Sequence, residues 1–574
     1  MSLADPLDPP GGLTGQSVTA VSLTWERIQI TIRAQLSAGL AVDPESVLVQ
    51  RLGIRNLAVR PAHVDLDGDL LRVRINVMQG PYRAPLWAGR WIVTVAPAGR
   101  GGRGGPGPGE AIPLSVASDV DLVPLEGRFP VAGRGDFIVR PELGKRDRIL
   151  IFRVGLAPSA ATSGTPGAPA VAGDDGTDHA DAHLVRPHPV VRFARRWLRR
   201  GRGALFQMAF NGFRLAARRN GRRILFTSDS RPELGGNLKL VHERLMERGL
   251  NRTYELMELF KPGIATPRSW RDRFRLPWLL ARADMVLIDD YQPAIYKVTD
   301  RKIRIIQLWH AYGSFKTVGY SRVGRPGGPD PWSRAHKNYT YAVVGSHNDV
   351  PFYAEAFGIR EEQVIAAGSP RMDLFLETIR GGGRRDALVD VFPEAANCRT
   401  ILFAPTFRGN GAKGAYFDAT RLDWRVIHEL CLEKEAVFIV RLHPFVREPP
   451  PIPPQYGDRI IDGTHRGADV NDLLPGVDVL ITDYSSVVYE YSLLRRPMLF
   501  YAYDLEEYIA SRDFYVRYED FVPGRIVRTF PALVDAIRRE EYELERVAPF
   551  VARSFDHLDG RSTDRIIDQL IIAG

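Results

Sequence analysis

The N-terminal part of the chain alternates hydrophobic and polar residues with a period of two. Residues 28–33 and 71–77 show it most clearly, with isoleucine, leucine or valine at every second position. Such alternation is typical of strands that bury one face. Further runs of this kind, without convincing helical stretches between them, extend the series: 91–95, 137–139 and 149–154. We therefore expect a small all-β, sandwich-like domain over residues 16–155.

From residue 221 onward, short apolar runs alternate with intervals that are compatible with helices. Runs without polar alternation are typical of parallel strands that are covered on both faces. A change of pattern between residues 375 and 399 divides the region into halves at 221–380 and 381–574. We therefore predict an α/β architecture of two doubly wound sheets that face each other across a cleft. The predicted strands are 224–227, 285–288, 303–308, 341–344, 400–404, 436–440 and 477–482.

The remaining segments differ in composition from both folded regions. Residues 1–15 are rich in Pro, Gly and Asp, which predicts a flexible tail. Residues 156–187 contain mainly Ala, Gly, Ser, Pro and Asp. Such a segment buries too little apolar surface to offset its ordering entropy, so we expect a disordered linker there.

Positive charge is concentrated in one segment rather than spread over the chain. Twelve arginines and no acidic residue lie between 186 and 223, whereas the whole chain has a net charge of +9. Residues 188–220 place apolar and aromatic side chains on one helical face and arginines on the other. This pattern is typical of a helix at an anionic membrane surface, and equally of a helix packed on its own protein with solvated arginines. Because no nucleic-acid reader motif accompanies the charge, we expect no nucleic-acid partner.

The two cysteines, Cys398 and Cys431, fit a reducing compartment, and neither has a neighbour at metal-ligand spacing. The sequence contains neither an apolar stretch of about 18 residues nor an N-terminal signal pattern. We therefore expect a cytoplasmic protein, with no metal and no cofactor, that can rest on a membrane.

Polar residues follow several predicted strands at the point where each strand ends. In doubly wound folds, ligands bind beyond the carboxyl ends of the strands. His310 follows the 303–308 run, and an imidazole at that place can accept a proton near neutral pH. Further residues occupy equivalent positions: Lys316, Arg408, His443 and Asp483. Each of these side chains has a structural alternative, such as capping a turn through hydrogen bonds.

Two other turns are suited to binding phosphate. Ser485 and Ser486 open a predicted helix, where hydroxyls and free backbone amides favour an anion; an N-cap that serves only its own helix is the alternative. Arg371 can clamp a phosphate and Asp373 can orient it, whereas the alternative is a turn with an internal ion pair.

Five motifs in the order of the chain resemble the CDP-glycerol glycerophosphotransferase family, which includes teichoic acid polymerases and primases. They are Gln-Leu-Trp-His-Ala-Tyr-Gly-Ser-Phe-Lys at 307–316, Gly-Ser-Pro-Arg-Met-Asp at 368–373, Phe-Ala-Pro-Thr-Phe-Arg at 403–408, Arg-Leu-His-Pro at 441–444 and Thr-Asp-Tyr-Ser-Ser at 482–486. The resemblance covers about 222 to the C-terminus. It implies a GT-B fold of two facing Rossmann-like halves and peripheral attachment to the inner face of the membrane. Ala311 and Tyr312 depart from the Gly-Thr of many members, which bears on the acceptor pocket.

The resemblance also implies a reaction and a set of residues. A hydroxyl of a lipid-linked polymer acceptor attacks the β-phosphorus of CDP-glycerol or a related CDP-polyol and expels CMP. His310 is expected to remove the proton, and His443 to support the diphosphate. The expected contacts to the donor diphosphate are Ser485, Ser486, Arg408, Arg371, Asp483 and Lys316, and those to the nucleotide are Thr406, Pro370 and Asp373.

Two other functions fit the same sequence. A sugar-nucleotide-dependent glycosyltransferase of GT-B fold that acts on a cell-surface polymer would use the same strand ends, because fold alone does not define activity. A non-catalytic membrane or polymer-binding protein would use the β-rich region and the arginine-rich helix instead.

Overall fold

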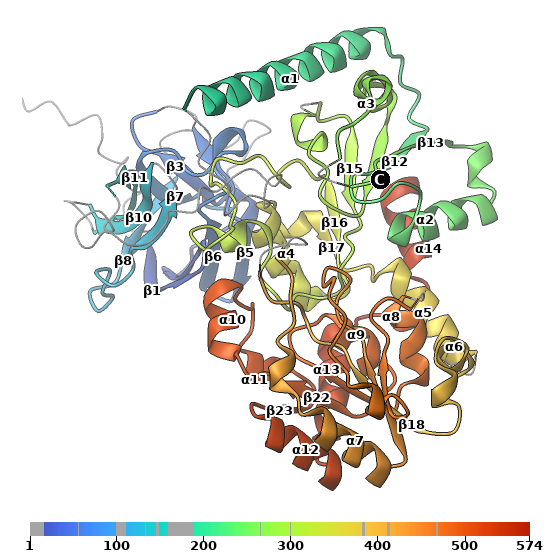
Figure 1. Ribbon diagram of the computed structural model, residues 1–574. Coiled ribbons are helices and arrows are strands. Elements are labelled where there is room, and N and C mark those ends of the chain that lie inside the picture. Colours follow the sequence, from blue (N-terminus) through green and yellow to red (C-terminus); the bar gives the residue numbers. More distant parts are fainter. Residues whose placement is uncertain are drawn as a thin grey trace, which may run out of the picture. The chain divides into compact units, whose positions relative to one another are not determined.

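The computed structural model is shown in Figure 1. It describes residues 16–54, 57–98, 111–131, 134–144, 148–158, 189–263, 266–298, 300–381, 385–409, 414–466 and 469–573. The predicted tail and nearly all of the predicted linker lie outside these residues. The chain forms two compact units.

The first unit is built from strands. Its sheet has the order β5-β6-β2-β1-β8-β7-β11-β10-β9, with β3 paired to β7 and β4 to β3. Neighbouring strands are antiparallel except β1 and β8, which are parallel. The strands are β1 (Val18–Glu26), β2 (Gln29–Leu36), β3 (Leu48–Arg51), β4 (Ala58–Val59), β5 (His63–Asp67), β6 (Leu70–Asn76), β7 (Gly89–Val95), β8 (Ile112–Val116), β9 (Gly127–Val131), β10 (Gly135–Leu143) and β11 (Leu150–Ala157).

A single hydrophobic core holds this sheet together. Buried side chains from strands far apart in the sheet order belong to one cluster, among them Ile32, Val73, Trp91, Phe137 and Phe152. Because both ends of the sheet contribute to the same cluster, the sheet curves over on itself. The alternation in the sequence therefore corresponds to an inner face that encloses one core.

Two segments from the middle of the chain complete the first unit, namely Thr317–Tyr339 and Pro351–Val364. Tyr320 and Val323 are buried in the same core as the strands. The second segment includes most of α4 (Val350–Phe357). The β-rich region is therefore not complete at the end of β11.

Buried polar contacts attach these segments to the strands. Glu355 is almost fully buried and accepts two hydrogen bonds from the guanidinium of Arg27, at 2.7 and 3.0 Å. The ammonium of Lys337 donates to the carbonyl oxygen of Met78 at 2.6 Å. Breaking the Arg27 contact would leave an uncompensated buried carboxylate, which makes this attachment costly to lose.

The second unit contains two six-stranded sheets. The first has the order β13-β12-β14-β15-β16-β17, and β12 to β16 pair in parallel. Its strands are β12 (Arg223–Ser228), β13 (Glu255–Phe260), β14 (Met285–Ile288), β15 (Arg304–Gln307), β16 (Tyr341–Val343) and β17 (Val364–Ile365). Its helices include α2 (Gly236–Glu247), α3 (Trp270–Arg282), α5 (Pro370–Arg380) and, from the end of the chain, α14 (Ser562–Ile566) with the following π-helical turn (Ile567–Ile572). Ile566 and Leu570 lie in the core of this first sheet.

The second sheet has the order β20-β19-β18-β21-β22-β23, and all its pairs are parallel. Its strands are β18 (Arg399–Phe403), β19 (Ala436–Val440), β20 (Ile460–Asp462), β21 (Val479–Thr482), β22 (Met498–Tyr501) and β23 (Arg525–Val527). The helices around it are α6 (Arg385–Val391), α7 (Trp424–Glu433), α8 (Val470–Leu473), α9 (Val487–Ser492), α10 (Leu505–Ser511), α11 (Tyr518–Phe521), α12 (Phe530–Arg539) and α13 (Val547–Ser554). Two parallel sheets in succession are what the apolar runs predict.

The arginine-rich segment forms one long helix, α1 (Pro189–Ala216), which contacts α3; Figure 1 shows α3 nearly end-on below one end of α1. Phe210 is fully buried, and the ring of Phe213 contacts that of Trp278 on α3 with centroids 5.3 Å apart. This end of α1 therefore packs on its own protein. Within the described residues we find no helix that combines the length and the apolar character needed to cross a bilayer.

Candidate active site

His310 lies on a strained turn directly after β15. Trp309 has a positive φ of 53°, which is rare for a bulky residue. Two buried amide side chains hold this turn. The Trp309 N–H donates to Oε1 of Gln307 at 2.9 Å, and Nδ2 of Asn237 donates to the Trp309 carbonyl oxygen at 2.6 Å. Strain of this kind persists only where the surroundings over-determine it, and it is concentrated at functional sites.

The turn leaves the imidazole of His310 accessible. Its side chain is 47% exposed, and Nδ1 lies 3.5 Å from Oδ1 of Asp290, which follows β14. The ring of Trp309 packs beside it, with centroids 4.6 Å apart. The geometry thus gives one imidazole nitrogen a carboxylate neighbour and leaves the ring in reach of a ligand.

The loop after His310 is embedded in the core of the second sheet. Tyr312 is buried, stacks on Phe555 with centroids 4.7 Å apart, and donates to the carbonyl oxygen of Ser554 at 3.2 Å. Phe315 stacks on Phe521 with centroids 4.2 Å apart. Tyr312, which stands where many members of the resembled family have threonine, therefore lies in the packing between the two sheets.

This embedding brings Lys316 to the second sheet. Its ammonium lies 5.5 Å from the centre of the Tyr508 ring on α10. Lys316 is also close enough to His443 that its positive charge contributes to lowering the pKa of that imidazole. Two motifs that are far apart in the sequence therefore meet in space.

His443 occupies the equivalent strand end in the second sheet, after β19. Nδ1 accepts a hydrogen bond from the N–H of Phe445 at 3.1 Å, and the rings of Phe407 and Phe445 pack against the imidazole. Burial first, and then the charge of Lys316, lower the pKa of His443. Because Nδ1 is an acceptor, the proton of the neutral ring is on Nε2. His443 is therefore arranged as a neutral hydrogen-bond donor.

Arg408, Thr406 and Asp483 form a network with one another. The guanidinium of Arg408 donates to Asp483 at 2.9 Å and to Asp504 at 2.8 Å, while Thr406 donates to Asp483 through both its N–H and its hydroxyl at 2.8 Å. Burial opposes the charge of Arg408, but the two carboxylates raise its pKa. These side chains tie the ends of β18 and β21 together.

Ser485 and Ser486 precede α9, which is a short helix of six residues. The hydroxyl of Ser485 accepts from the N–H of Val487 at 3.3 Å, whereas Ser486, the N-cap residue, makes no side-chain capping bond. The hydroxyl of Ser486 is therefore not committed to its own helix.

Arg371 connects the first sheet to α9. The guanidinium of Arg371 lies 3.0 Å from the carboxylate of Glu490, which is fully buried. The backbone N–H of Arg371 donates to Oδ1 of Asn237 at 3.1 Å. Burial raises the pKa of Glu490, and Arg371 opposes that effect. Since Asn237 also holds the turn before His310, the motifs at 307–316 and 368–373 are linked through Asn237, and Glu490 links Arg371 to the helix that follows the motif at 482–486.

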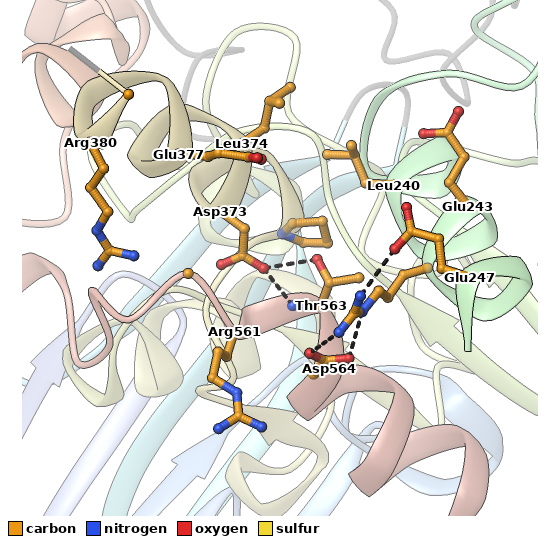
Figure 2. Close-up of a pocket in the computed structure, with 14 residues that line it drawn as sticks. Leu240, Glu243, Glu247, Asp373, Leu374, Glu377, Arg380, Arg561, Thr563 and Asp564 are labelled. Atoms are coloured by element: carbon orange, nitrogen blue, oxygen red, sulfur yellow. Dashed lines mark hydrogen bonds and ion pairs between the residues drawn. The ribbon is translucent and has the colours of Figure 1, made fainter. Parts of the chain in front are cut away.

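Pro370 and Asp373 also belong to the first turn of α5, but they contact other groups than Arg371 does. Asp373 accepts hydrogen bonds from the N–H groups of Ser562 and Thr563, at 3.0 and 2.7 Å, and so caps α14. Both residues line a cavity of about 740 Å³ between α2, α5 and α14, shown in Figure 2. Neither His310 nor His443 lines this cavity.

Several residues of this site were missed at the level of sequence. Asp290, Asn237, Gln307, Glu490 and Asp504 all contact the predicted residues. Asp290 is the second residue after the predicted strand 285–288, so the strand-end rule applies to it as well. In the described part of the chain there is no group of three or more His, Cys, Asp or Glu side chains placed to hold a metal ion.

Comparison with known proteins places this chain in a family. The family model described as CDP-Glycerol:Poly(glycerophosphate) glycerophosphotransferase matches residues 209–572. The chain is 45% identical over 371 residues to teichoic acid ribitol-phosphate polymerase TarK of Staphylococcus aureus, covering 64% of this chain and 72% of that protein. It is 28% identical over 296 residues to teichoic acid glycerol-phosphate primase of Bacillus subtilis, covering 51% and 74%.

A solved structure of the wall teichoic acid polymerase TagF has a similar fold. Its TM-score is 0.50 with 21% sequence identity, over 66% of this chain and 97% of that chain. At that identity the likeness concerns the fold alone. The match of the family model over 209–572, more than half of the chain, establishes that the chain is an enzyme of the CDP-glycerol:poly(glycerophosphate) glycerophosphotransferase family, a transferase of phosphorus-containing groups.

Proposed function

We propose that the enzyme transfers a polyol phosphate from a CDP-activated donor to a hydroxyl of a lipid-linked cell-wall polymer and releases CMP. One observation carries this proposal. Lys316, on the loop of His310, reaches the second sheet, where its ammonium lies 5.5 Å from the centre of the Tyr508 ring and its charge acts on His443, which supports assigning both strand-end imidazoles to one site. A general base on one sheet and a hydrogen-bond donor on the other suit a reaction in which a hydroxyl attacks a diphosphate.

In this proposal His310 accepts the proton of the acceptor hydroxyl. The hydroxyl oxygen forms a bond to the β-phosphorus, and the bond from that phosphorus to the bridging oxygen breaks. CMP leaves with the electron pair, and Nε2–H of His443 donates to the phosphate oxygens that gain charge. No covalent intermediate is required.

The other predicted residues divide into two groups in the proposal. Lys316, Arg371, Ser485 and Ser486 contact the donor diphosphate, because their side chains retain exposed or uncommitted polar groups. The second group positions these contacts: Arg408, Asp483 and Thr406 hold the strand ends, and Pro370 and Asp373 hold the turn that carries Arg371. The second group was expected from the sequence to contact the donor itself; the hydrogen bonds that Arg408, Thr406 and Asp373 make within the protein support a positioning role instead.

The transferred polyol is a separate question. Glycerol is the expectation from the sequence motifs, but the ribitol-phosphate polymerase TarK is 45% identical and the glycerol-phosphate primase only 28%. This difference favours ribitol phosphate as the transferred group. Glycerol phosphate is the alternative.

Supplying CDP-ribitol and CDP-glycerol in parallel and measuring CMP release with a lipid-linked or short soluble acceptor tests both points. We expect turnover with at least one CDP-polyol and a higher kcat/KM for CDP-ribitol. CMP release from neither donor, with turnover of a UDP- or GDP-sugar instead, would contradict the proposal and favour a glycosyltransferase.

Attachment to the inner face of the membrane is part of the same proposal, because the acceptor is lipid-linked. On α3, Trp270 and Phe274 are exposed one helical turn apart, and the guanidinium of Arg271 lies 5.4 Å from the centre of the Trp270 ring. Met208 on the neighbouring α1 is also exposed. Exposed aromatics beside arginines support binding to anionic lipid.

Co-sedimentation with vesicles that contain anionic phosphatidylglycerol tests the attachment. We expect the double substitution Trp270→Ala and Phe274→Ala to reduce the bound fraction several-fold. Leu432→Ala, which removes an exposed leucine from α7, is the control and should bind like the wild type. Equal binding of all three proteins would exclude this surface.

A further inference from the structure

Asp290 is placed beside His310 by the register of the sheet. β14 and β15 are parallel neighbours, and Ile288 pairs with Gln307 at their carboxyl ends. Asp290 is two residues beyond Ile288, and His310 is three residues beyond Gln307. The two side chains therefore leave adjacent strands at the same edge, where Oδ1 of Asp290 and Nδ1 of His310 lie 3.5 Å apart.

One buried side chain holds both partners. Nε2 of Gln307 donates to the carbonyl oxygen of Asp290 at 3.2 Å, while its Oε1 accepts from the N–H of Trp309 at 2.9 Å. Gln307 is fully buried. The carboxylate of Asp290 is further oriented by the N–H of Tyr291, which donates to Oδ1 at 2.6 Å. The separation between carboxylate and imidazole is therefore set by the protein before any ligand arrives.

The neighbouring carboxylate does not serve the same purpose. Asp289 is fully buried and lies 2.9 Å from the guanidinium of Arg231, on the loop after β12. Burial is the main reason that the pKa of Asp289 is raised to about 7. Asp290 is partly exposed and faces His310. Of this pair of acids, only Asp290 is paired with the imidazole.

We propose that Asp290 is a positioning residue for His310. Its carboxylate accepts the Nδ1–H of the neutral imidazole, which leaves Nε2 unprotonated and available to the acceptor hydroxyl. When Nε2 takes the proton, the same carboxylate stabilises the imidazolium and itself stays ionised. This inference rests on the proposed function, because it assigns His310 the part of the base. A long hydrogen bond in the ligand-free protein that shortens on substrate binding is common for such pairs.

Steady-state kinetics of Asp290→Asn gives the first test. An amide can present its NH₂ group to Nδ1 and so favour the other tautomer, and in the serine protease triad this exchange lowers kcat by about 10⁴-fold. Here we expect kcat to fall on the order of 10²-fold or more. The KM for the CDP-polyol should stay within about threefold, because Asp290 contacts no donor-binding residue in the proposal.

The chain offers a matched control. Asp458 lies 2.9 Å from Nε2 of His428, away from the strand ends that carry the motifs, so Asp458→Asn makes the same change beside another histidine. We expect Asp458→Asn to keep the wild-type kcat. A kcat of Asp290→Asn within twofold of the wild type would overturn the proposal.

A second measurement does not depend on turnover. Nitrogen-15 spectra of histidine-labelled full-length protein at a pH of about 8.5, above the ordinary imidazole range, report which ring nitrogen carries the proton. His310→Gln identifies the His310 signals. We expect the Nδ1–H tautomer in the wild type and loss of that preference in Asp290→Asn.

The two measurements separate the proposals. An unchanged tautomer in a folded Asp290→Asn protein, as judged by circular dichroism, would overturn the role of Asp290 whatever the reaction is. If instead the tautomer changes but neither CDP-polyol is turned over, the proposed function fails while the pairing of Asp290 with His310 stands.

Discussion

The two histidines occupy the same place in two similar sheets but have opposite surroundings. His310 is half-exposed on a strained turn, and Nδ1 faces the carboxylate of Asp290. His443 is packed between the rings of Phe407 and Phe445, and its Nδ1 accepts a backbone hydrogen bond. Burial and the nearby charge of Lys316 disfavour the protonated form of the His443 imidazole.

In the proposed reaction, this difference gives one residue type at one topological position two chemical roles. An imidazole that must take up a proton benefits from a carboxylate that stabilises the charge it gains. An imidazole that must donate a hydrogen bond without losing its proton benefits from a lowered pKa and a fixed tautomer. The architecture places both rings at strand ends, and the immediate neighbours decide what each ring does.

Replacing each histidine by alanine breaks the comparison most directly. We expect His310→Ala to lower kcat on the order of 10³-fold with little change in CDP affinity, because a general base acts only in the chemical step. His443→Ala should lower kcat by about 10²-fold and also weaken CDP binding. A preorganised hydrogen-bond donor stabilises both the bound CDP-polyol and the transition state. Measured CMP release and calorimetric titration with CDP separate the two patterns.

His428→Ala is the control for both substitutions, since His428 pairs with Asp458 on the surface of the second sheet. It should retain wild-type turnover and CDP affinity. If His310→Ala and His443→Ala lose the same parameter to the same extent, the two rings do not have distinct roles.

The comparison also requires that the two sheets hold the rings at a set separation, and Gly313 contributes to this. Gly313 has a φ of +66°, and a Cβ there would lie 2.0 Å from the ring of Tyr489 on α9. Gly313→Ala should therefore lower stability by about 1–3 kcal/mol through overpacking, in addition to about 1–2 kcal/mol for the left-handed backbone. We expect a lower Tm and a kcat reduced by about tenfold or more, because misplacement on the scale of an ångström is costly.

Gly221→Ala isolates the backbone contribution. Gly221 has a φ of +76°, but a Cβ there would meet no atom within 4 Å. Its Tm should fall less than that of Gly313→Ala, and its kcat should not change. Equal effects of the two substitutions would mean that the contact with Tyr489 is unimportant.

The sequence predicts the strands of the second unit because they are buried on both faces. All seven predicted runs correspond to strands, and 436–440 coincides with β19. Five of the twelve strands in the two sheets were not predicted: β13, β17, β20, β22 and β23. β13 (Glu255–Phe260) is an edge strand with Glu255 and Glu258 exposed, which hides the apolar run, whereas the other four have only two to four residues, and β22 was missed although it is buried throughout. Periodicity detects burial, so an element that is only half-buried gives a weak signal.

The sequence was less informative about the partners of the site residues. Strand ends identified His310 and His443, but the pairing of His310 with Asp290 depends on the register of two strands. Arg408 and Asp483 stood out for the same reason as the histidines, yet in the structure they bond to each other. A polar residue that faces a ligand and one that ties two strand ends look the same in a sequence.

Domain boundaries show a similar limit. Thr317–Tyr339 directly follows the first motif in the sequence but belongs to the β-rich unit in the structure. Its buried residue Tyr320 packs with residues that precede it by more than 150 positions, such as Phe152. Local composition carries no information about such distant contacts.

Removing the charge of Lys316 sharpens the comparison by changing one histidine only. Lys316 lowers the pKa of His443 in addition to the effect of burial, so Lys316→Met should raise that pKa toward its ordinary value. The midpoint of the His443 titration, followed by NMR, should therefore move to higher pH. We also expect the KM for the CDP-polyol to rise by about tenfold, since a cation near the diphosphate is lost.

The aromatic signals of Phe407 and Phe445, rather than the direction of the shift, distinguish this effect from a general loss of structure. Unfolding around His443 would also remove its desolvation, but it would broaden the aromatic signals of Phe407 and Phe445 as well. Lys239→Met, on the exposed face of α2, removes a cation elsewhere and should change neither the titration nor the KM. A His443 midpoint that stays in place or moves to lower pH would show that Lys316 does not act on this ring.

The smallest effect concerns the packing of His443. Phe407→Leu removes a ring that contacts the imidazole with centroids 4.8 Å apart, while it keeps an apolar side chain of similar length. An aromatic contact of this kind contributes about 0.5–1.5 kcal/mol. We therefore expect kcat to fall by about two- to tenfold, because the orientation of the His443 imidazole becomes less defined. Phe417→Leu is the matched control, because Phe417 belongs to the same core but packs on Phe403 rather than on His443. If both substitutions lower kcat equally, the loss reflects the core of the second sheet as a whole, and the aromatic enclosure of His443 has no separate part in its role as a donor.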